Sequence, residues 1–193
     1  VCFIVHRPLQ AEAQTAADML GAELKFLPSG GDTRIRADLE TTLAAAQEIR
    51  RVRPHIVLAP SSHLNQHPDH RETSLLVRDA NRLARYGKTP GLEELDPHVS
   101  QLLLFYDISS DGSKADELNT VFVDISHQIE KWKALMECHA SQVKNMDYIE
   151  LQLSRARALG IQMGVHSAIR LYSERPMLLS SVADLISMKG QRF

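Results

Sequence analysis

The chain has 193 residues, of which 44% are hydrophobic and 24% are charged, and its 22 Lys and Arg against 24 Asp and Glu give a formal net charge of −2. This length suits one domain over residues 1–193 with a sizeable core. The charge balance argues against binding to nucleic acid or to a membrane surface, because both need a concentrated basic patch. No apolar run approaches the roughly 18 residues that span a bilayer. The two cysteines, Cys2 and Cys138, are too few for a disulfide framework, so we expect a cytoplasmic protein.

Strand and helix patterns alternate along the chain. The first half predicts strands at 1–5, 23–27 and 56–60, and helices over 11–20, 37–53 and 70–86. The second half predicts strands at 101–106 and 120–125 and helices over 126–138 and 147–159. The short apolar pieces at 177–179 and 182–186 carry no assignment. Alternation with short connections predicts an α/β fold, Rossmann-like and three-layered, with a mostly parallel sheet.

The first residues already have the pattern of a buried strand. The chain begins at Val1 without an initiator methionine, and we therefore expect an upstream segment to be missing from this sequence. In doubly wound folds, ligands lie outside the carboxyl ends of the strands. The loop that follows the apolar run 56–60 is thus the place where chemistry is expected.

Three histidines, His63, His67 and His70, fall within eight residues of this loop, beside Asp69. Imidazole is a common metal ligand and general acid or base, so this cluster is suggestive. The alternative is structural: Asp69 would cap the following helix, with Glu72 as its capping-box partner. Spacing alone leaves both interpretations open.

A resemblance favours the functional interpretation. Residues 53–60 and 67–71 resemble the second signature of the LmbE/PIG-L family of zinc-dependent N-deacetylases, and residues 12–21, 123–126, 133–135 and 139–142 are similar to further stretches of that family in the same order. Residues 164–176 lie where these enzymes, the bacillithiol-type deacetylases especially, have a late loop and strand. The family's first signature, His-Pro-Asp-Asp-Glu, matches nothing in this sequence. The resemblance implies that it follows a first strand upstream of Val1, so that the domain is N-terminally incomplete.

The family implies a metal-dependent hydrolase that removes the acetyl group from an N-acetylglucosaminide-type amino sugar. Zn²⁺, or another divalent metal, would activate water and polarise the amide carbonyl. By position, His70 resembles the metal ligand and His67 the protonated histidine that faces the oxyanion, while Asp69 would orient His67 and favour its charged form.

Two further residues are candidates for substrate binding. Asp32 follows a strand and would hydrogen-bond a sugar hydroxyl, or serve as an ordinary turn aspartate. Arg7 lies two positions from the place where the family often has a substrate-binding arginine. His166 is expected to line a pocket or to be structural. The partner is a small N-acetylated sugar, and the apolar tail is compatible with a homo-oligomer.

Two other functions stay open. One is a non-catalytic sugar-binding relative that lacks the first metal motif. The other is an amidase that acts on a thiol conjugate.

Overall fold

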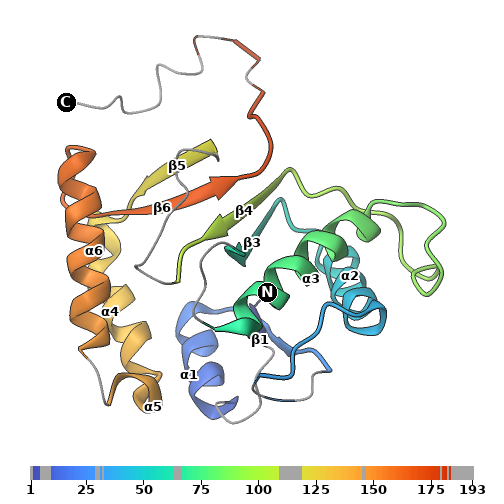
Figure 1. Cartoon of the computed structure of the whole chain (residues 1–193), viewed down its shortest axis with the longest axis horizontal. Helices are drawn as coiled ribbons and strands as arrows, with labels where there is room; N and C mark the ends of the chain where they lie inside the picture. Colours follow the sequence, from blue (N-terminus) through green and yellow to red (C-terminus); the bar gives the residue numbers. More distant parts are fainter. Residues whose placement is uncertain are drawn as a thin grey trace. The chain divides into compact units, whose positions relative to one another are not determined.

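The structure is a computed structural model, and it describes residues 2–4, 10–28, 31, 33–62, 67–108, 119–144, 147–178, 180, 181 and 183 (Figure 1). The chain divides into two compact units, Val1–Lys114 and Ala115–Phe193. No helix in the described ranges is both long enough and apolar enough to cross a membrane. The expectation of one domain over residues 1–193 stays a prediction.

The first unit alternates strands and helices in parallel pairs. Its elements are β1 (Cys2–Ile4), α1 (Gln10–Leu20), β2 (Leu24–Phe26), α2 (Leu39–Val52), β3 (Ile56–Pro60), α3 (Pro68–Ala84) and β4 (Leu102–Tyr106). Strand β1 pairs with β2 in parallel, and β3 pairs with β4 in parallel from Ile56 opposite Leu102 to Pro60 opposite Tyr106. Each predicted element of this half is confirmed to within two residues at its ends.

Helices α2 and α3 lie side by side and hold the core of this unit (Figure 1). Three alanines at their contact, Ala46, Ala80 and Ala84, have no exposed surface, which lets the two helices approach closely. The buried cluster consists of Leu27, Ala45, Ala46, Ile49, Leu76, Ala80, Ala84 and Leu92. Burial of this apolar surface is the main force that fixes α3 in place.

Arg50 is a charged residue inside this core, only 3% exposed. The sequence places Arg50 near the carboxyl end of its own helix, α2, where a cation interacts favourably with the helix dipole. Its guanidinium instead reaches α3 and the loop beyond, where it donates hydrogen bonds of 2.5–3.4 Å to the carbonyl oxygens of Leu83, Ala84, Tyr86, Leu92 and Leu95. Arg50 therefore caps the carboxyl end of α3 from a neighbouring helix.

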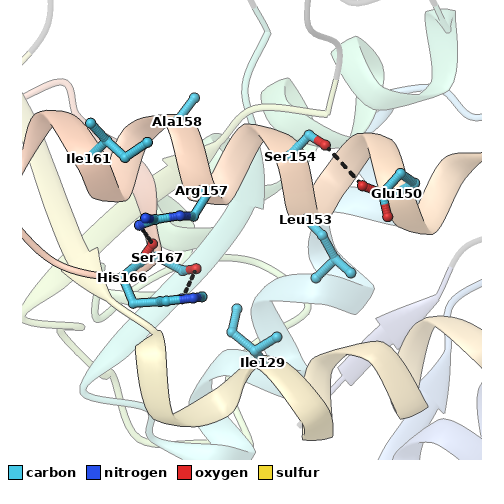
Figure 2. Close-up of a pocket in the computed structure, with 9 residues that line it drawn as sticks. All are labelled: Ile129, Glu150, Leu153, Ser154, Arg157, Ala158, Ile161, His166 and Ser167. Carbon is cyan, nitrogen blue, oxygen red and sulfur yellow. Dashed lines mark hydrogen bonds between the residues drawn. The ribbon is translucent and has the colours of Figure 1, made fainter.

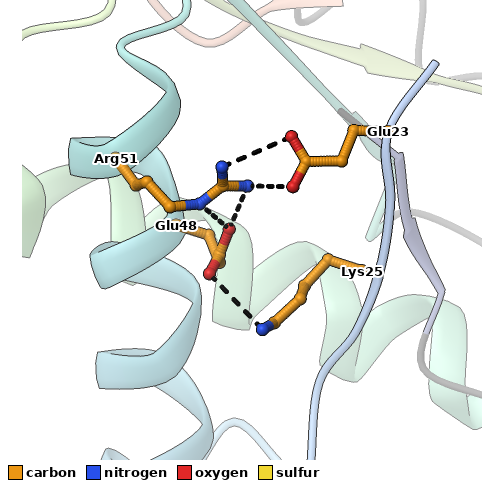
Figure 3. A network of polar contacts seen from close by, with 4 residues as sticks. All are labelled: Glu23, Lys25, Glu48 and Arg51. Carbon is orange, nitrogen blue, oxygen red and sulfur yellow. Dashed lines mark hydrogen bonds and ion pairs between the residues drawn. The ribbon is translucent and has the colours of Figure 1, made fainter.

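A polar network joins β2 to the outer face of α2 (Figure 3). The guanidinium of Arg51 lies 2.6 Å from the Glu23 carboxylate and 2.7 Å from that of Glu48, and Lys25 Nζ lies 3.9 Å from Glu48. The pairing with two carboxylates raises the pKa of Arg51, and the Glu48 contact is the larger cause. These contacts connect segments that are more than twenty residues apart in the sequence.

The described part of the second unit contains an antiparallel pair of strands and three helices. Its elements are β5 (Asn119–Asp124), a 3-10 turn (Ser126–Gln128), α4 (Ile129–Glu137), α5 (Ala140–Val143), α6 (Tyr148–Gln162) and β6 (Ala168–Ser173). Strand β6 runs antiparallel to β5, from Asn119 opposite Ser173 to Asp124 opposite Ala168. The described residues thus contain both parallel and antiparallel strand pairs. The α/β class is confirmed, whereas the mostly parallel sheet is not. Helical and strand periodicity does not report strand direction, which is why the sequence missed this.

Gly160 makes the turn from α6 into β6 possible. A Cβ at this position would lie 2.5 Å from the carbonyl oxygen of His166 and 2.6 Å from Cα of Ser167. The backbone that leads into β6 therefore packs directly on the last turns of α6, at a distance that only a glycine permits.

Candidate functional site at the start of helix α3

The predicted catalytic loop leaves the sheet at the carboxyl end of β3. The Ser61 N–H donates to the Tyr106 carbonyl oxygen at 2.8 Å, which extends the pairing with β4 one residue beyond β3. Residues 63–66, and with them His63, lie outside the described residues. The chain is described again from His67, directly before α3.

His67 is the residue that caps α3. The backbone of His67 is extended, and Pro68 occupies the first helical position. Nδ1 of His67 accepts a hydrogen bond from the Asp69 N–H at 3.3 Å. The helix consequently begins two residues earlier than predicted. The capping-box alternative is wrong, because Asp69 lies inside the helix and is not its cap.

Asp69 is nearly buried, with 6% of its surface exposed. Its Oδ2 accepts the Thr33 N–H at 2.8 Å and lies 3.9 Å from Nδ1 of His67. Its Oδ1 is also buried and accepts no hydrogen bond within the part of the chain that the structure describes. A buried carboxylate oxygen without a donor is unusual in a folded protein and is compatible with a functional role.

The geometry determines which nitrogen of His67 can reach a ligand. Because Nδ1 accepts a backbone N–H, the neutral ring carries its proton on Nε2. The His67 side chain is 40% exposed. The 3.9 Å separation from Asp69 permits a charge interaction but is too long for a hydrogen bond. The proposed orientation of a protonated His67 by Asp69 stays a prediction.

His70 lies one turn of helix beyond His67, and the two ring centroids are 5.4 Å apart. Partial burial is the main cause that lowers the pKa of His70; the charge of His67 acts in the same direction and that of Asp69 opposes it. A lowered pKa favours the neutral imidazole at neutral pH. That form is the one that binds a metal ion.

The described residues do not form a complete zinc site. Among them, no group of three or more His, Cys, Asp or Glu side chains is placed to hold a metal ion. A zinc site requires three protein ligands and an open position. His70 is a candidate for one of those ligands, and zinc binding stays a prediction.

The remaining predicted residues are less informative. Asp32 and Arg7 lie outside the described residues.

His166 lines a pocket of about 500 Å³ in the second unit, as expected (Figure 2). There its Nδ1 lies 2.9 Å from Ser167 Oγ and its carbonyl oxygen accepts a hydrogen bond from Arg157 at 2.7 Å. Since these polar groups bond to one another, we assign the pocket no role. Its other lining residues are Ile129, Glu150, Leu153, Ser154, Ala158 and Ile161.

The sequence missed the segment that lies against the first turn of α3. Besides the Thr33 contact with Asp69, the Ala37 N–H donates to Glu72 Oε2 at 3.1 Å. Every residue except proline carries a backbone N–H, so the sequence does not show which of them donates to a side chain. The acidic residue at position 72 was the available signal, and its partner lies 35 residues away in the chain.

Comparison with known proteins found a matching family model and two similar sequences. Residues 5–81 match the family model PIG-L, described as GlcNAc-PI de-N-acetylase. The chain is 30% identical over 168 residues to diacetylchitobiose deacetylase of Thermococcus kodakarensis, covering 84% of this chain and 59% of that protein. It is 28% identical over 167 residues to 4-oxalmesaconate hydratase of Pseudomonas putida, covering 81% of this chain and 60% of that protein. The chain thus spans about 60% of the length of these relatives.

Solved structures show the same fold. The conserved protein TT1542 of Thermus thermophilus superposes with a TM-score of 0.77 at 27% identity, over 92% of this chain and 82% of that one. The hydratase GalB of Pseudomonas putida gives 0.71 at 25% identity, over 89% and 72%. The N,N'-diacetylchitobiose deacetylase of Pyrococcus horikoshii gives 0.69 at 21% identity, over 90% and 66%, and supports the fold alone. By its sequence match over residues 5–81, its relatives and its fold, the chain contains a PIG-L/LmbE family domain.

Proposed function

We propose that this chain is a hydrolase that removes the acetyl group from an N-acetylated amino sugar. The observation that carries the proposal is the grouping of His67, Asp69 and His70 at the start of α3, the helix that follows β3 in the chain. The similarity to a diacetylchitobiose deacetylase supports a sugar substrate.

His67 suits the stabilisation of an oxyanion. Amide hydrolysis passes through a tetrahedral intermediate, and a donor aimed at its oxygen accelerates the reaction. The Nδ1 contact with the Asp69 N–H directs the proton of the neutral His67 ring to Nε2, which makes Nε2–H the donor of this side chain. The partial positive charge at the N-terminus of α3 favours negative charge in the same region. These two features give the first turn of α3 the electrostatics that an acyl-transfer intermediate needs.

A divalent metal, with zinc as the first candidate, is part of the proposal. In such hydrolases a metal lowers the pKa of a bound water and polarises the carbonyl. His70 would supply one ligand, because its lowered pKa favours the neutral ring. The role of His67 above is argued from its own hydrogen bonds and does not depend on the metal.

The test is hydrolysis of N,N'-diacetylchitobiose and N-acetylglucosamine, followed by the free amine and acetate released. We expect His67→Ala to retain metal and to lose about 10²–10³-fold in kcat, the usual effect of removing an oxyanion donor. His70→Ala should lose bound zinc, measured by elemental analysis. His55→Ala, which removes an exposed histidine of the same unit, is the matched control and should behave as the wild type.

Two results would contradict these roles. Unchanged turnover in His67→Ala would exclude it as the oxyanion donor, and zinc retained in full by His70→Ala would exclude it as a ligand. Sugar binding without acetate release by the wild type would favour the non-catalytic alternative. Turnover of a thiol-conjugate amide in preference to the sugars would favour the amidase alternative.

A hydratase is the second candidate function, because a sequence relative and a solved structure, both from Pseudomonas putida, are hydratases by name. Water addition to a double bond changes ultraviolet absorbance and releases no acetate. The same preparations, assayed with 4-oxalmesaconate, therefore separate the two functions. A cytoplasmic location and a homo-oligomer stay predictions for this protein.

A further inference from the structure

The segment 33–37 is held against the first turn of α3 at two points. Asp69 Oδ2 accepts the Thr33 N–H at 2.8 Å, and Glu72 Oε2 accepts the Ala37 N–H at 3.1 Å. Asp69 and Glu72 are three residues apart, so they lie on the same face of the helix. The two carboxylates thus match two amides of one segment and fix it along the helix axis.

Further contacts make this segment rigid. Ile35 is buried, and the Arg36 guanidinium folds back to donate to the Ile35 carbonyl oxygen at 2.6 Å. Asp38, the next residue, caps α2 by accepting the Thr41 N–H at 2.8 Å. Thr33 has a φ of 60°, a left-handed conformation that a β-branched residue adopts where its surroundings hold it.

The segment also lies beside the candidate catalytic histidine. Asp69 Oδ2, which accepts the Thr33 N–H, is 3.9 Å from His67 Nδ1. The backbone of Thr33 and the ring of His67 are therefore close neighbours across one carboxylate. The side chains of Thr33, Arg34 and Arg36 are exposed and give this edge a polar, cationic surface.

We propose that Glu72 is a positioning residue that holds segment 33–37 in place as one wall of the substrate site. Glu72 acts through the segment and not on the reacting atoms. The inference rests on the proposed function in one respect, namely that His67 marks the place where substrate binds. It predicts that Glu72 governs substrate affinity more than the chemical step.

The acceptor oxygen is the property of Glu72 that matters. Its carboxylate also lies 3.9 Å from Nη1 of Arg71, which is well exposed. A glutamine at position 72 retains an oxygen for the Ala37 N–H but loses the charge. Leucine and alanine remove the acceptor, and both are good helix formers, so α3 tolerates them. Arg71→Ala removes the ion pair and leaves the contact with Ala37 intact, which makes it the matched control.

The experiment measures amide exchange of Thr33 and Ala37 together with steady-state kinetics on whichever substrate class the wild type turns over. For Glu72→Leu and Glu72→Ala we expect exchange at Ala37 to be about tenfold faster and KM about tenfold higher, with kcat within about twofold, as for loss of uniform binding. Glu72→Gln and Arg71→Ala should match the wild type in both measurements.

Three results would overturn the proposal. The first is unchanged exchange at Ala37 in Glu72→Leu and Glu72→Ala. The second is faster exchange with unchanged KM, and the third is a fall in kcat at constant KM. A wild type that turns over neither the N-acetylated sugars nor the hydratase substrate refutes the proposed function, and the exchange of Ala37 then decides the role of Glu72 by itself.

Discussion

Replacing Arg50 with methionine tests whether a single buried guanidinium holds the carboxyl end of α3. Methionine replaces the aliphatic stem of arginine and has no donor, so the substitution removes all five contacts to carbonyl oxygens and keeps most of the packing of the stem. Those carbonyls belong to the end of α3 and to the loop as far as Leu95. The substitution therefore perturbs α3 at the end opposite to His67.

The expected magnitude follows from what each carbonyl retains. Leu83, Ala84, Tyr86 and Leu92 each accept a second hydrogen bond, for example that from the His98 N–H to Ala84 at 2.9 Å. Leu95 has no second donor among the described hydrogen bonds. We assign about 1–3 kcal/mol to the orphaned carbonyl and smaller losses to the other four. At about 0.5 kcal/mol for each of those four, the total is about 3–5 kcal/mol, a large share of the stability of an ordinary domain.

The assay is urea denaturation of Arg50→Met followed by circular dichroism. The midpoint should fall while the slope with denaturant stays constant, since the surface exposed on unfolding is unchanged. Arg53→Met is the control: Arg53 is exposed and makes one long contact of 3.5 Å, so its effect should be below about 0.5 kcal/mol. A loss of less than about 1 kcal/mol in Arg50→Met would refute the reasoning, because charged hydrogen bonds to buried carbonyls would then contribute little.

Two further predictions concern Gly160 and His70. Gly160→Ala places a Cβ 2.5 Å from the His166 carbonyl oxygen, so we expect a loss of about 1–3 kcal/mol in thermal melting, the usual cost of overpacking. Gly87→Ala, whose Cβ would have no neighbour nearer than 3.9 Å, is its control, and equal melting temperatures for the two variants would contradict the close approach. His70 should titrate below its ordinary pKa of 6.5 in an NMR experiment on the folded protein, because burial disfavours its charged form. The unfolded chain then binds the proton more readily, so the stability due to neutral His70 is present above pH 6.5 and is lost as the pH falls through the lower, folded value. A midpoint at or above 6.5 would contradict this assignment.

The sequence predicted local structure well and distant contacts poorly. The strand at 56–60 and the neighbouring helices follow from apolar periodicity, proline and glycine, which act within a few residues. The same local logic suggested Asp69 as a helix cap with Glu72 as its partner. Their true partners, the amides of Thr33 and Ala37, are 36 and 35 residues away, and no pattern in a single sequence reveals them.

For the candidate site, too, the residues were predicted from the sequence and their contacts were not. His67, Asp69 and His70 were found because they are adjacent in the sequence and resemble a family signature. The state of each side chain was not predictable, because it depends on packing: His67 turns its Nδ1 toward its own helix, and the burial of His70 lowers its pKa. Strand β6, which the resemblance placed and periodicity did not, runs antiparallel to β5, and the backbone that leads into it packs on α6 at Gly160.

Both ends of helix α3 bond to residues that lie more than thirty positions before their partners in the chain. Its first turn bonds to Thr33 and Ala37, and its last turn is capped by Arg50. Contacts of such sequence separation form late in folding, since the intervening chain must be ordered first. The geometry around His67 is therefore a product of cooperative folding of the whole segment 33–95. We expect partial unfolding of this segment to detach Thr33 and Ala37 from the first turn of α3 before the helix itself melts, so that a change around His67 reports instability early.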